Sequence, residues 1–157
     1  GLLSEIREAK LKPNVRSYNS GIRACEEGRQ WQRASELLRE MGEANVALDV
    51  MSYSGVIRAC GEGGQWQRAC ALLSIMLETR LDPDNFSYNA VLRACKENGQ
   101  WEQALELLSE MRTGRVDPNV ISYVAVISAC QQVKQWQRAL ALFGEMLEAE
   151  LEPNVIS

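Results

Sequence analysis

Histidine is absent from this 157-residue sequence, and none of its five cysteines forms a CxxC pair. Zinc sites of the usual spacing are therefore unsupported, because their ligands come from closely spaced Cys and His residues. A glycine-rich phosphate-binding loop that follows a strand is also lacking. These absences argue against an enzyme, and we expect no catalytic residue, no metal and no cofactor.

Long apolar runs and an excess of positive charge are missing as well. No run approaches the roughly 18 apolar residues needed to span a bilayer, so membrane insertion is not expected. The formal net charge is −4, whereas nucleic-acid-binding domains usually carry a basic balance. This counts only weakly against RNA binding, because the charge of the binding face matters more than the sum. Five reduced thiols suit a cytosolic or organelle-matrix compartment better than secretion.

What the sequence does contain is a repeat with a step of 35 residues. Four residue types mark it: Tyr18, Tyr53, Tyr88 and Tyr123; Cys25, Cys60, Cys95 and Cys130; Trp31, Trp66, Trp101 and Trp136; Met41, Met76, Met111 and Met146. A fixed period of this size is typical of stacked arrays, in which each unit buries its apolar face on its neighbours. The repeated cysteines are interpreted as small apolar core residues.

Each repeat has the pattern of two helices. In the third copy, apolar residues spaced three and four apart predict a first helix. This helix ends at Asn98-Gly99, and a second helix begins at Trp101. The predicted first helices are 16–27, 51–62, 86–97 and 121–132, and the second helices are 31–42, 66–78, 101–112 and 136–148. The tryptophans open the second helices, so we expect them to pack between repeats rather than to stack on bases. The fold class is all-α, with stacked antiparallel helix pairs.

The motifs VRSYNSGIRAC at 15–25 and ALELLSEM at 104–111, with a closing Pro-Asp or Pro-Asn, resemble the pentatricopeptide repeat family. The resemblance implies a right-handed α-solenoid superhelix that binds single-stranded RNA, one base per repeat. It also implies a nuclear-encoded protein of the mitochondrial matrix or plastid stroma. The closing pair sets repeats at 15–49, 50–84, 85–119 and 120–154. Residues 1–14 would hold the second helix of a truncated repeat, and 155–157 would begin another, so we expect part of a longer array.

The resemblance assigns base reading to the fifth and last residues of each repeat. The pairs are Asn19 with Asp49 for U, Ser54 with Asp84 for G, Asn89 with Asn119 for C or U, and Val124 with Asn154, which matches no established pair. The implied target is 5′-U-G-(C/U)-N-3′. The second residues would pack against the bases: Arg16, Met51, Phe86 and Ile121.

Some positions depart from the family pattern. Val124 cannot hydrogen-bond a base edge, and Leu48 replaces the expected Pro. Late in the first helix, where the family often has Lys near the RNA backbone, the chain has Glu27, Glu62, Glu97 and Gln132. Carboxylates near phosphates are unfavourable, because phosphate neutralisation normally dominates nucleic-acid affinity.

A row of arginines could compensate for the missing lysines. Arg23, Arg58 and Arg93 each follow a reading residue by four positions, which places them on the same helical face. They are either phosphate contacts or surface residues paired with Glu three or four positions away. Both interpretations stay open.

Two functions remain. The first, which is favoured, is an RNA-binding array in organellar RNA processing, stability, editing or translation, with no DNA partner. The second is a protein-binding scaffold in a large organellar assembly, such as a ribosome or a photosynthetic or respiratory complex. Helical arrays offer extended concave surfaces that suit either partner.

Overall fold

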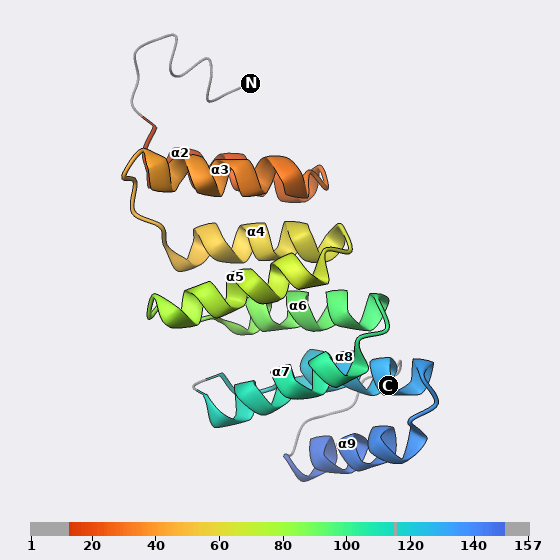
Figure 1. Cartoon of the computed structure of the whole chain (residues 1–157). Helices are drawn as coiled ribbons and strands as arrows, with labels where there is room; N and C mark the ends of the chain where they lie inside the picture. The colour runs from red at the N-terminus through yellow and green to blue at the C-terminus, as the bar shows by residue number, and fades with distance from the viewer. Residues whose placement is uncertain (1–12, 115, 150–157) are drawn as a thin grey trace. The chain divides into compact units, whose positions relative to one another are not determined.

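The computed structural model describes residues 13–114 and 116–149. Within these ranges it contains eight helices and no strand (Figure 1). The helices are α2 (Val15–Glu27), α3 (Trp31–Glu43), α4 (Val50–Glu62), α5 (Trp66–Glu78), α6 (Asn85–Glu97), α7 (Trp101–Thr113), α8 (Val120–Gln132) and α9 (Trp136–Glu148). Each of the eight helices predicted between residues 16 and 148 is present, and the bounds differ from prediction by one residue at most.

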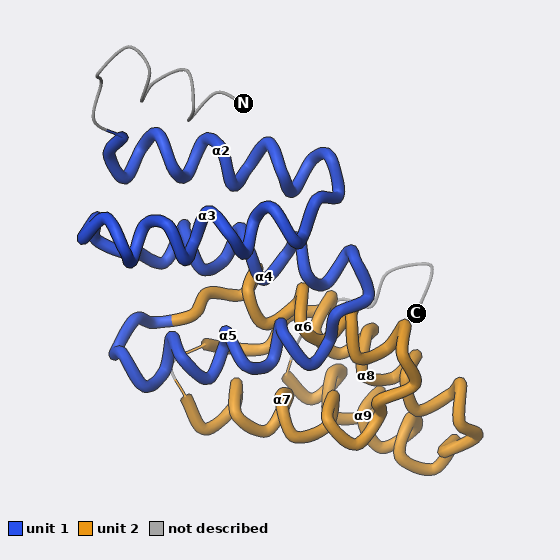
Figure 2. The backbone as a smooth tube through the Cα atoms, turned by 45° about the horizontal axis from the view of Figure 1, so that its top comes forward, with its two compact units in different colours: residues 1–82 blue, residues 83–157 orange. Residues whose placement is uncertain are grey.

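The chain forms two compact units, residues 1–82 and residues 83–157 (Figure 2). In unit 1, α2 packs on α3 and α4, and α4 packs in turn on α3 and α5. In unit 2, α6 packs on α7 and α8, and α8 packs on α7 and α9. Each unit is therefore two stacked helix pairs, which confirms the predicted all-α architecture. The handedness of a superhelix stays a prediction.

Each first helix begins one residue earlier than predicted, because a polar side chain caps it. The N-cap residues Asn14, Asp49, Asp84 and Asn119 all accept a hydrogen bond from the backbone N–H of the serine three residues later. Such a cap stabilises a helix by about 1 kcal/mol relative to Ala. The pattern [Asn/Asp]-x-x-Ser therefore fixes where these helices start.

The turns between the helices of a pair contain one left-handed residue each. These residues are Arg29, Gly64, Gly99 and Lys134, with φ of 57°, 72°, 69° and 60°. The predicted stop at Asn98-Gly99 is confirmed, and the left-handed residue of that turn is the glycine. Arg29 and Lys134 adopt the same conformation with a side chain, which costs about 1–2 kcal/mol.

The constant residues of the repeat form the core. Tyr18, Met41, Met76 and Met111 are almost fully buried. The cysteine prediction is confirmed for Cys60, Cys95 and Cys130, which are 0% exposed, whereas Cys25 is half-buried. Burial raises the pKa of the Cys60 thiol, which suits an unreactive core residue.

Two tryptophans pack between repeats, as predicted. The Arg68 guanidinium lies 4.9 Å from the ring centre of Trp31, and that of Arg138 lies 5.1 Å from the ring centre of Trp101. In both cases the arginine comes from the second helix of the following repeat, and it forms a cation–π contact. Trp136, for which the described residues include no following repeat, is 63% exposed.

Some sequence predictions fall outside the described residues. They are residues 1–12 of the truncated repeat predicted at 1–14, Asn154, and the start of a further repeat at 155–157. Among the helices in the described ranges, none combines the length and the hydropathy that crossing a bilayer requires. The same ranges hold no group of three or more His, Cys, Asp or Glu side chains placed to bind a metal ion.

Candidate nucleic-acid interface

In unit 1 the predicted reading residues Asn19 and Asp49 lie in direct contact, although 30 positions separate them. The amide Nδ2 of Asn19 donates to both carboxylate oxygens of Asp49 at 3.4 Å. The hydroxyl of Ser52 lies 2.7 Å from Asn19 Oδ1 and 2.7 Å from Asp49 Oδ1. We refer to Asn19, Asp49 and Ser52 as the polar cluster of unit 1.

Unit 2 contains the same arrangement one repeat pair later. Asn89 Nδ2 donates to Asn119 Oδ1 at 3.3 Å. The Ser122 hydroxyl donates to Asn89 Oδ1 at 2.7 Å and lies 3.0 Å from Asn119 Oδ1. Asn89, Asn119 and Ser122 form the polar cluster of unit 2. The stacking of one helix pair on the next is what brings the fifth residue of one repeat to the N-cap of the following helix.

The carboxylate of Asp49 is stabilised in its charged form. Burial by itself would raise the pKa of Asp49, but the hydrogen bonds from Ser52 and Asn19 outweigh it, and the pKa lies below its usual value. Asp49 is therefore ionised at neutral pH and acts only as an acceptor. Asn119, at the same position of unit 2, keeps an amide group that can both donate and accept.

Serine is the part of both clusters that the sequence prediction missed. Ser52 and Ser122 are fully buried, and each hydroxyl lies within hydrogen-bond distance of both predicted reading residues. A signal was present, because Ser17, Ser52, Ser87 and Ser122 recur at the repeat step, always just before the repeated Tyr. Buried hydroxyls with well-placed partners hold neighbouring side chains in one arrangement.

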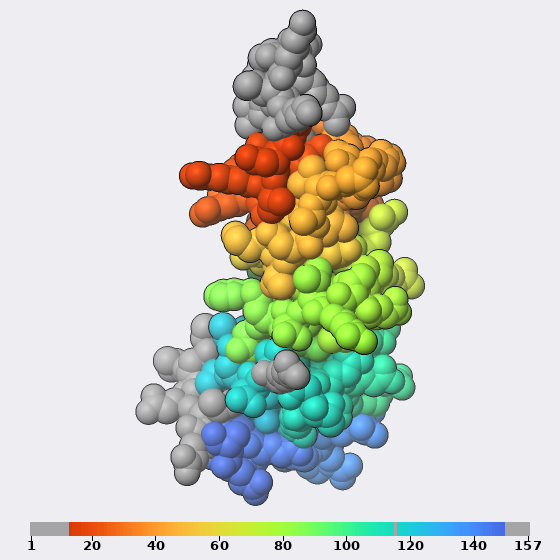
Figure 3. All heavy atoms as spheres, turned by 90° about the vertical axis from the view of Figure 1, so that its left-hand side faces the viewer, coloured from red at the N-terminus to blue at the C-terminus, as the bar shows by residue number. Residues whose placement is uncertain are grey.

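The predicted base-packing residues are all exposed. Met51, Phe86 and Ile121 are 71%, 68% and 61% exposed, unusually high fractions for large apolar side chains near the start of a helix. Arg16 is exposed too, and side chains from the start of α2 project from the surface of unit 1 (Figure 3). Each of the four lies two residues after an N-cap residue, so it is presented near a candidate reading residue.

The arginines four positions after the reading residues take part in ion pairs. Arg23 pairs with Glu27 at 3.6 Å, and Arg93 pairs with Glu97 at 3.2 Å, both across one helical turn. Arg58 instead reaches Glu26 of the preceding first helix, at 3.2 Å. Burial raises the pKa of Glu26, and the charge of Arg58 only partly offsets this. In the described residues each of these cations thus has a carboxylate partner.

The other predicted reading residues are placed less fully. Ser54 is buried on α4 of unit 1, and Asp84 is the exposed N-cap of α6 in unit 2. Val124 is half-buried on α8, and its predicted partner lies outside the described residues. The pairing at these two repeats therefore stays a prediction.

Comparison with known proteins identifies the repeats. The PPR repeat family matches residues 49–97 and 83–132, and the PPR repeat matches residues 16–46 and 121–151. Together these matches span most of the chain. The chain belongs to the PPR repeat family. The predicted resemblance to pentatricopeptide repeat proteins is thereby confirmed.

Solved pentatricopeptide structures share the fold of this PPR chain. The maize pentatricopeptide repeat protein PPR10 is 19% identical with a TM-score of 0.86, covering 98% of this chain and 22% of that protein. PPR10 in complex with an 18-nucleotide psaJ RNA element gives a TM-score of 0.82 at 19% identity, covering 98% and 23%. The PPR domain of Arabidopsis thaliana protein-only RNase P 1, in complex with tRNA, gives 0.86 at 15% identity, covering 98% and 81%.

The PPR chain thus spans less than a quarter of the length of PPR10. At these identities the likeness concerns the fold. The comparison with curated proteins gave no significant match.

Proposed function

We propose that this PPR chain is a non-enzymatic module that binds single-stranded RNA, with one base per repeat. The observation that carries the proposal is the pair of polar clusters. Each one joins a fifth residue to a last residue through hydrogen bonds, beside an exposed residue that can pack on a base. Two of the similar structures are complexes with RNA, one with an 18-nucleotide element and one with tRNA.

The chemistry of the last residue matches the bases that the family pattern assigns. Uracil presents an N–H donor at N3, and guanine presents one at N1, so both suit the acceptor-only carboxylates of Asp49 and Asp84. Cytosine presents an acceptor at N3, which suits the amide donor of Asn119. On this basis the proposed target is 5′-U-G-(C/U)-N-3′, with no base specified by Val124.

Preorganisation supports the same proposal. Ser52 and Ser122 hold the reading side chains before any ligand binds, so less side-chain entropy is lost on binding. Base packing on Met51 and Ile121 lacks aromatic stacking, and only Phe86 offers the about 1–3 kcal/mol that an aromatic platform contributes per base. Most affinity must then come from the number of repeats and from phosphate contacts.

The arginine ion pairs favour the second candidate function, a protein-binding scaffold. Arg23, Arg58 and Arg93 already have carboxylate partners, so RNA phosphates must compete with Glu27, Glu26 and Glu97. The pairs of Arg23 and Arg93 are exposed, and exposed ion pairs are weak, about 0–1 kcal/mol, so phosphate can replace them. We therefore place RNA first. Membership of the PPR repeat family supports a location in the matrix or stroma of an organelle.

The deciding experiment is RNA binding measured by fluorescence anisotropy at several salt concentrations. An oligonucleotide with one U-G-C in a neutral background should bind more tightly than its shuffled counterparts. The logarithm of the association constant should fall with the logarithm of salt concentration, with a slope of about −0.7 per neutralised phosphate. Equal and negligible binding to all sequences would exclude the RNA function and leave the scaffold.

A double variant tests the arginines separately from the bases. Glu27→Gln with Glu97→Gln frees Arg23 and Arg93 from their partners without a change of shape. If these arginines contact phosphate, the variant binds RNA more tightly and with a steeper salt slope, while base preference stays the same. An unchanged slope would make them surface residues only. Glu43→Gln, which frees the remote Arg39, is the matched control.

A further inference from the structure

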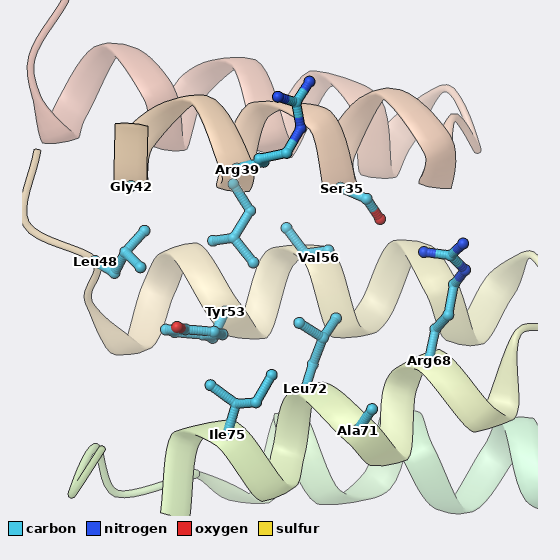
Figure 4. Close-up of a pocket in the computed structure, with 11 residues that line it drawn as sticks. Ser35, Arg39, Gly42, Leu48, Tyr53, Val56, Arg68, Ala71, Leu72 and Ile75 are labelled. Carbon is cyan, nitrogen blue, oxygen red and sulfur yellow. The ribbon is translucent and has the colours of Figure 1, made fainter. Parts of the chain in front are cut away.

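Unit 1 has a groove on the side formed by its second helices. Its volume is about 420 Å³, and the residues that line it include Arg39, Tyr53, Val56, Arg68, Leu72 and Ile75. In Figure 4, Leu72 and Ile75 point from α5 toward α3, while Tyr53 lies between the two helices and Leu48 closes one end. The floor is apolar, and α3 and α5 form the two walls.

At the equivalent place in unit 2, a salt bridge joins the two second helices, α7 and α9. Arg112 on α7 pairs with Glu145 on α9. The same guanidinium donates to the Tyr123 hydroxyl at 3.4 Å and lies 5.6 Å from the centre of the tyrosine ring. Arg112 and Glu145 thus cover the tyrosine and join the two walls.

Unit 1 cannot form that bridge. At the repeat positions of Arg112 and Glu145 it has Gly42 and Ile75. A Cβ atom at Gly42 would meet nothing within 4 Å, and Ile75 is 39% exposed although it is a large apolar residue. The groove is therefore open because of two substitutions within an otherwise constant frame.

The charged side chains that line the groove are all cationic. Arg39 and Arg68 are its charged lining residues, and no carboxylate is among the residues that line it. Arg39 pairs with Glu43 at 2.8 Å, but both side chains are mostly exposed, so the pair is weak. Apolar floor and cationic rim together fit a ligand that is apolar on one side and acidic along its edges.

We propose that this groove binds an acidic amphipathic helix of a partner protein. Two antiparallel helix pairs leave a channel between α3 and α5 into which apolar side chains at i, i+3, i+4 and i+7 can insert. Carboxylates at the edge of that helix would pair with Arg39 and Arg68. Charge complementarity of this kind favours the correct partner and speeds association.

The groove and the proposed RNA surface lie on different sides of α4. Tyr53 and Val56 line the groove, whereas Met51 and Arg58 lie about 140–160° away around the helix, at about 100° per residue. Partner and RNA can therefore bind at the same time. The inference is independent of the RNA function, and either one can fail alone.

The test is a selection from a displayed library of helices about 16 residues long, randomised at every surface position. Selection on the wild-type chain should enrich helices with a Leu-, Ile- or Phe-rich stripe flanked by Asp and Glu. The enriched helices should bind the double variant Gly42→Arg, Ile75→Glu, which copies the bridge of unit 2, at least about tenfold more weakly. Failure of enrichment, enrichment of basic helices, or undiminished binding to the double variant would overturn the proposal.

The reverse exchange, which puts the residues of unit 1 into unit 2, is a test by gain of binding, which a misfolded variant would not show. Arg112→Gly with Glu145→Ile should open the groove of unit 2 and admit a second copy of the selected helix. That copy should bind more weakly than the first, because Ser109 stands at the position equivalent to Arg39. Circular dichroism melts should show that both double variants stay folded, and RNA binding should be unchanged in the first of them. A fatty acid, dodecanoate, is tested in the same way. If dodecanoate binds the wild-type chain and loses affinity for Gly42→Arg, Ile75→Glu, while no helix does so, the groove is a lipid site and the proposed partner is wrong.

Discussion

The polar clusters of the two units share one frame and differ in one functional group. Both join an asparagine to an N-cap residue through a buried serine hydroxyl, with contacts of 2.7 Å to the asparagine. The N-cap residue is Asp49 in unit 1 and Asn119 in unit 2. The difference teaches that packing sets the geometry of the cluster, while a single oxygen or nitrogen sets the hydrogen-bonding capacity that, in the proposed function, would select the base.

The opposite side of the units shows a similar contrast. Gly42 and Ile75 leave a groove open in unit 1, whereas Arg112 and Glu145 bridge the same place in unit 2. Neither exchange disturbs the constant core residues. A repeat of this kind therefore varies on two surfaces while its interior stays the same, and the predictions below test that separation.

The largest effect is expected in the shared core. Met41→Ala and Met111→Ala each remove a side chain that is 1% exposed or less, and each should lower the free energy of unfolding by about 2–5 kcal/mol. Equal losses in urea titrations would confirm that the two units have equivalent cores. Met51→Ala, at an exposed position, is the control and should change stability by about 0.5 kcal/mol or less. A large loss in only one unit would break the comparison.

The next effect is on base preference. Asn119→Asp makes the cluster of unit 2 chemically identical to that of unit 1, so the third base should shift from C toward U. A hydrogen-bonded base contact contributes about 1–3 kcal/mol of discrimination, so the ratio of affinities should change by about fivefold or more. Anisotropy with oligonucleotides that differ only at that base measures it. Asp49→Asn should shift the first base the opposite way, and unchanged ratios in both variants would refute the proposed reading frame.

A smaller effect is expected in the turns. Arg29→Gly in unit 1 and Lys134→Gly in unit 2 relieve a left-handed conformation, and each should raise the free energy of unfolding by up to about 1 kcal/mol. Gly64→Ala and Gly99→Ala should lower it by a similar amount. A Cβ atom at either glycine meets nothing within 4 Å, so only the backbone conformation is tested. Thermal melts measure these shifts. If the substitutions to Gly do not raise the melting temperature and the substitutions to Ala do not lower it, this account is wrong.

The smallest effect concerns acid stability. The pKa of Asp49 lies below its usual value in the folded protein. The charged group therefore adds stability above the ordinary aspartate pKa of about 3.9, and this contribution is lost as pH falls through and below that value. The stability difference between wild type and Asp49→Asn should shrink between about pH 6 and pH 3. A constant difference would mean that the carboxylate is not stabilised by Ser52 and Asn19.

Much of the fold follows from local sequence patterns. Apolar spacing predicts the helices, and the regular Trp positions predict where the second helices start, because these signals act within a few residues. The exposure of Met51, Phe86 and Ile121 could also be expected, since each lies two residues after an N-cap residue and off the apolar stripe.

The rest depends on distances across repeats. The Ser52 contact to Asn19 joins residues 33 positions apart, and its geometry follows from how closely α2 and α4 pack. Arg58 pairs with Glu26 of another helix, whereas local spacing offered Glu62. The groove needs Gly42 and Ile75 together, and neither residue is unusual by itself. The sequence shows which side chains on different helices could interact, but it does not show which of them are in contact in the folded protein.

The N-cap position restricts which specificities this protein could evolve. The last residue of a repeat is also the residue that starts the next helix, as Asp49 and Asn119 show. Asn, Asp, Ser, Thr and Gly are the residues that cap well. A drift toward Gln, Glu or Arg, which also have groups that can hydrogen-bond a base, would therefore weaken the helix. Under the proposed RNA function, the last residue of a repeat is therefore limited to short side chains. New RNA targets would then arise by exchange among these few residues or by gain and loss of whole repeats.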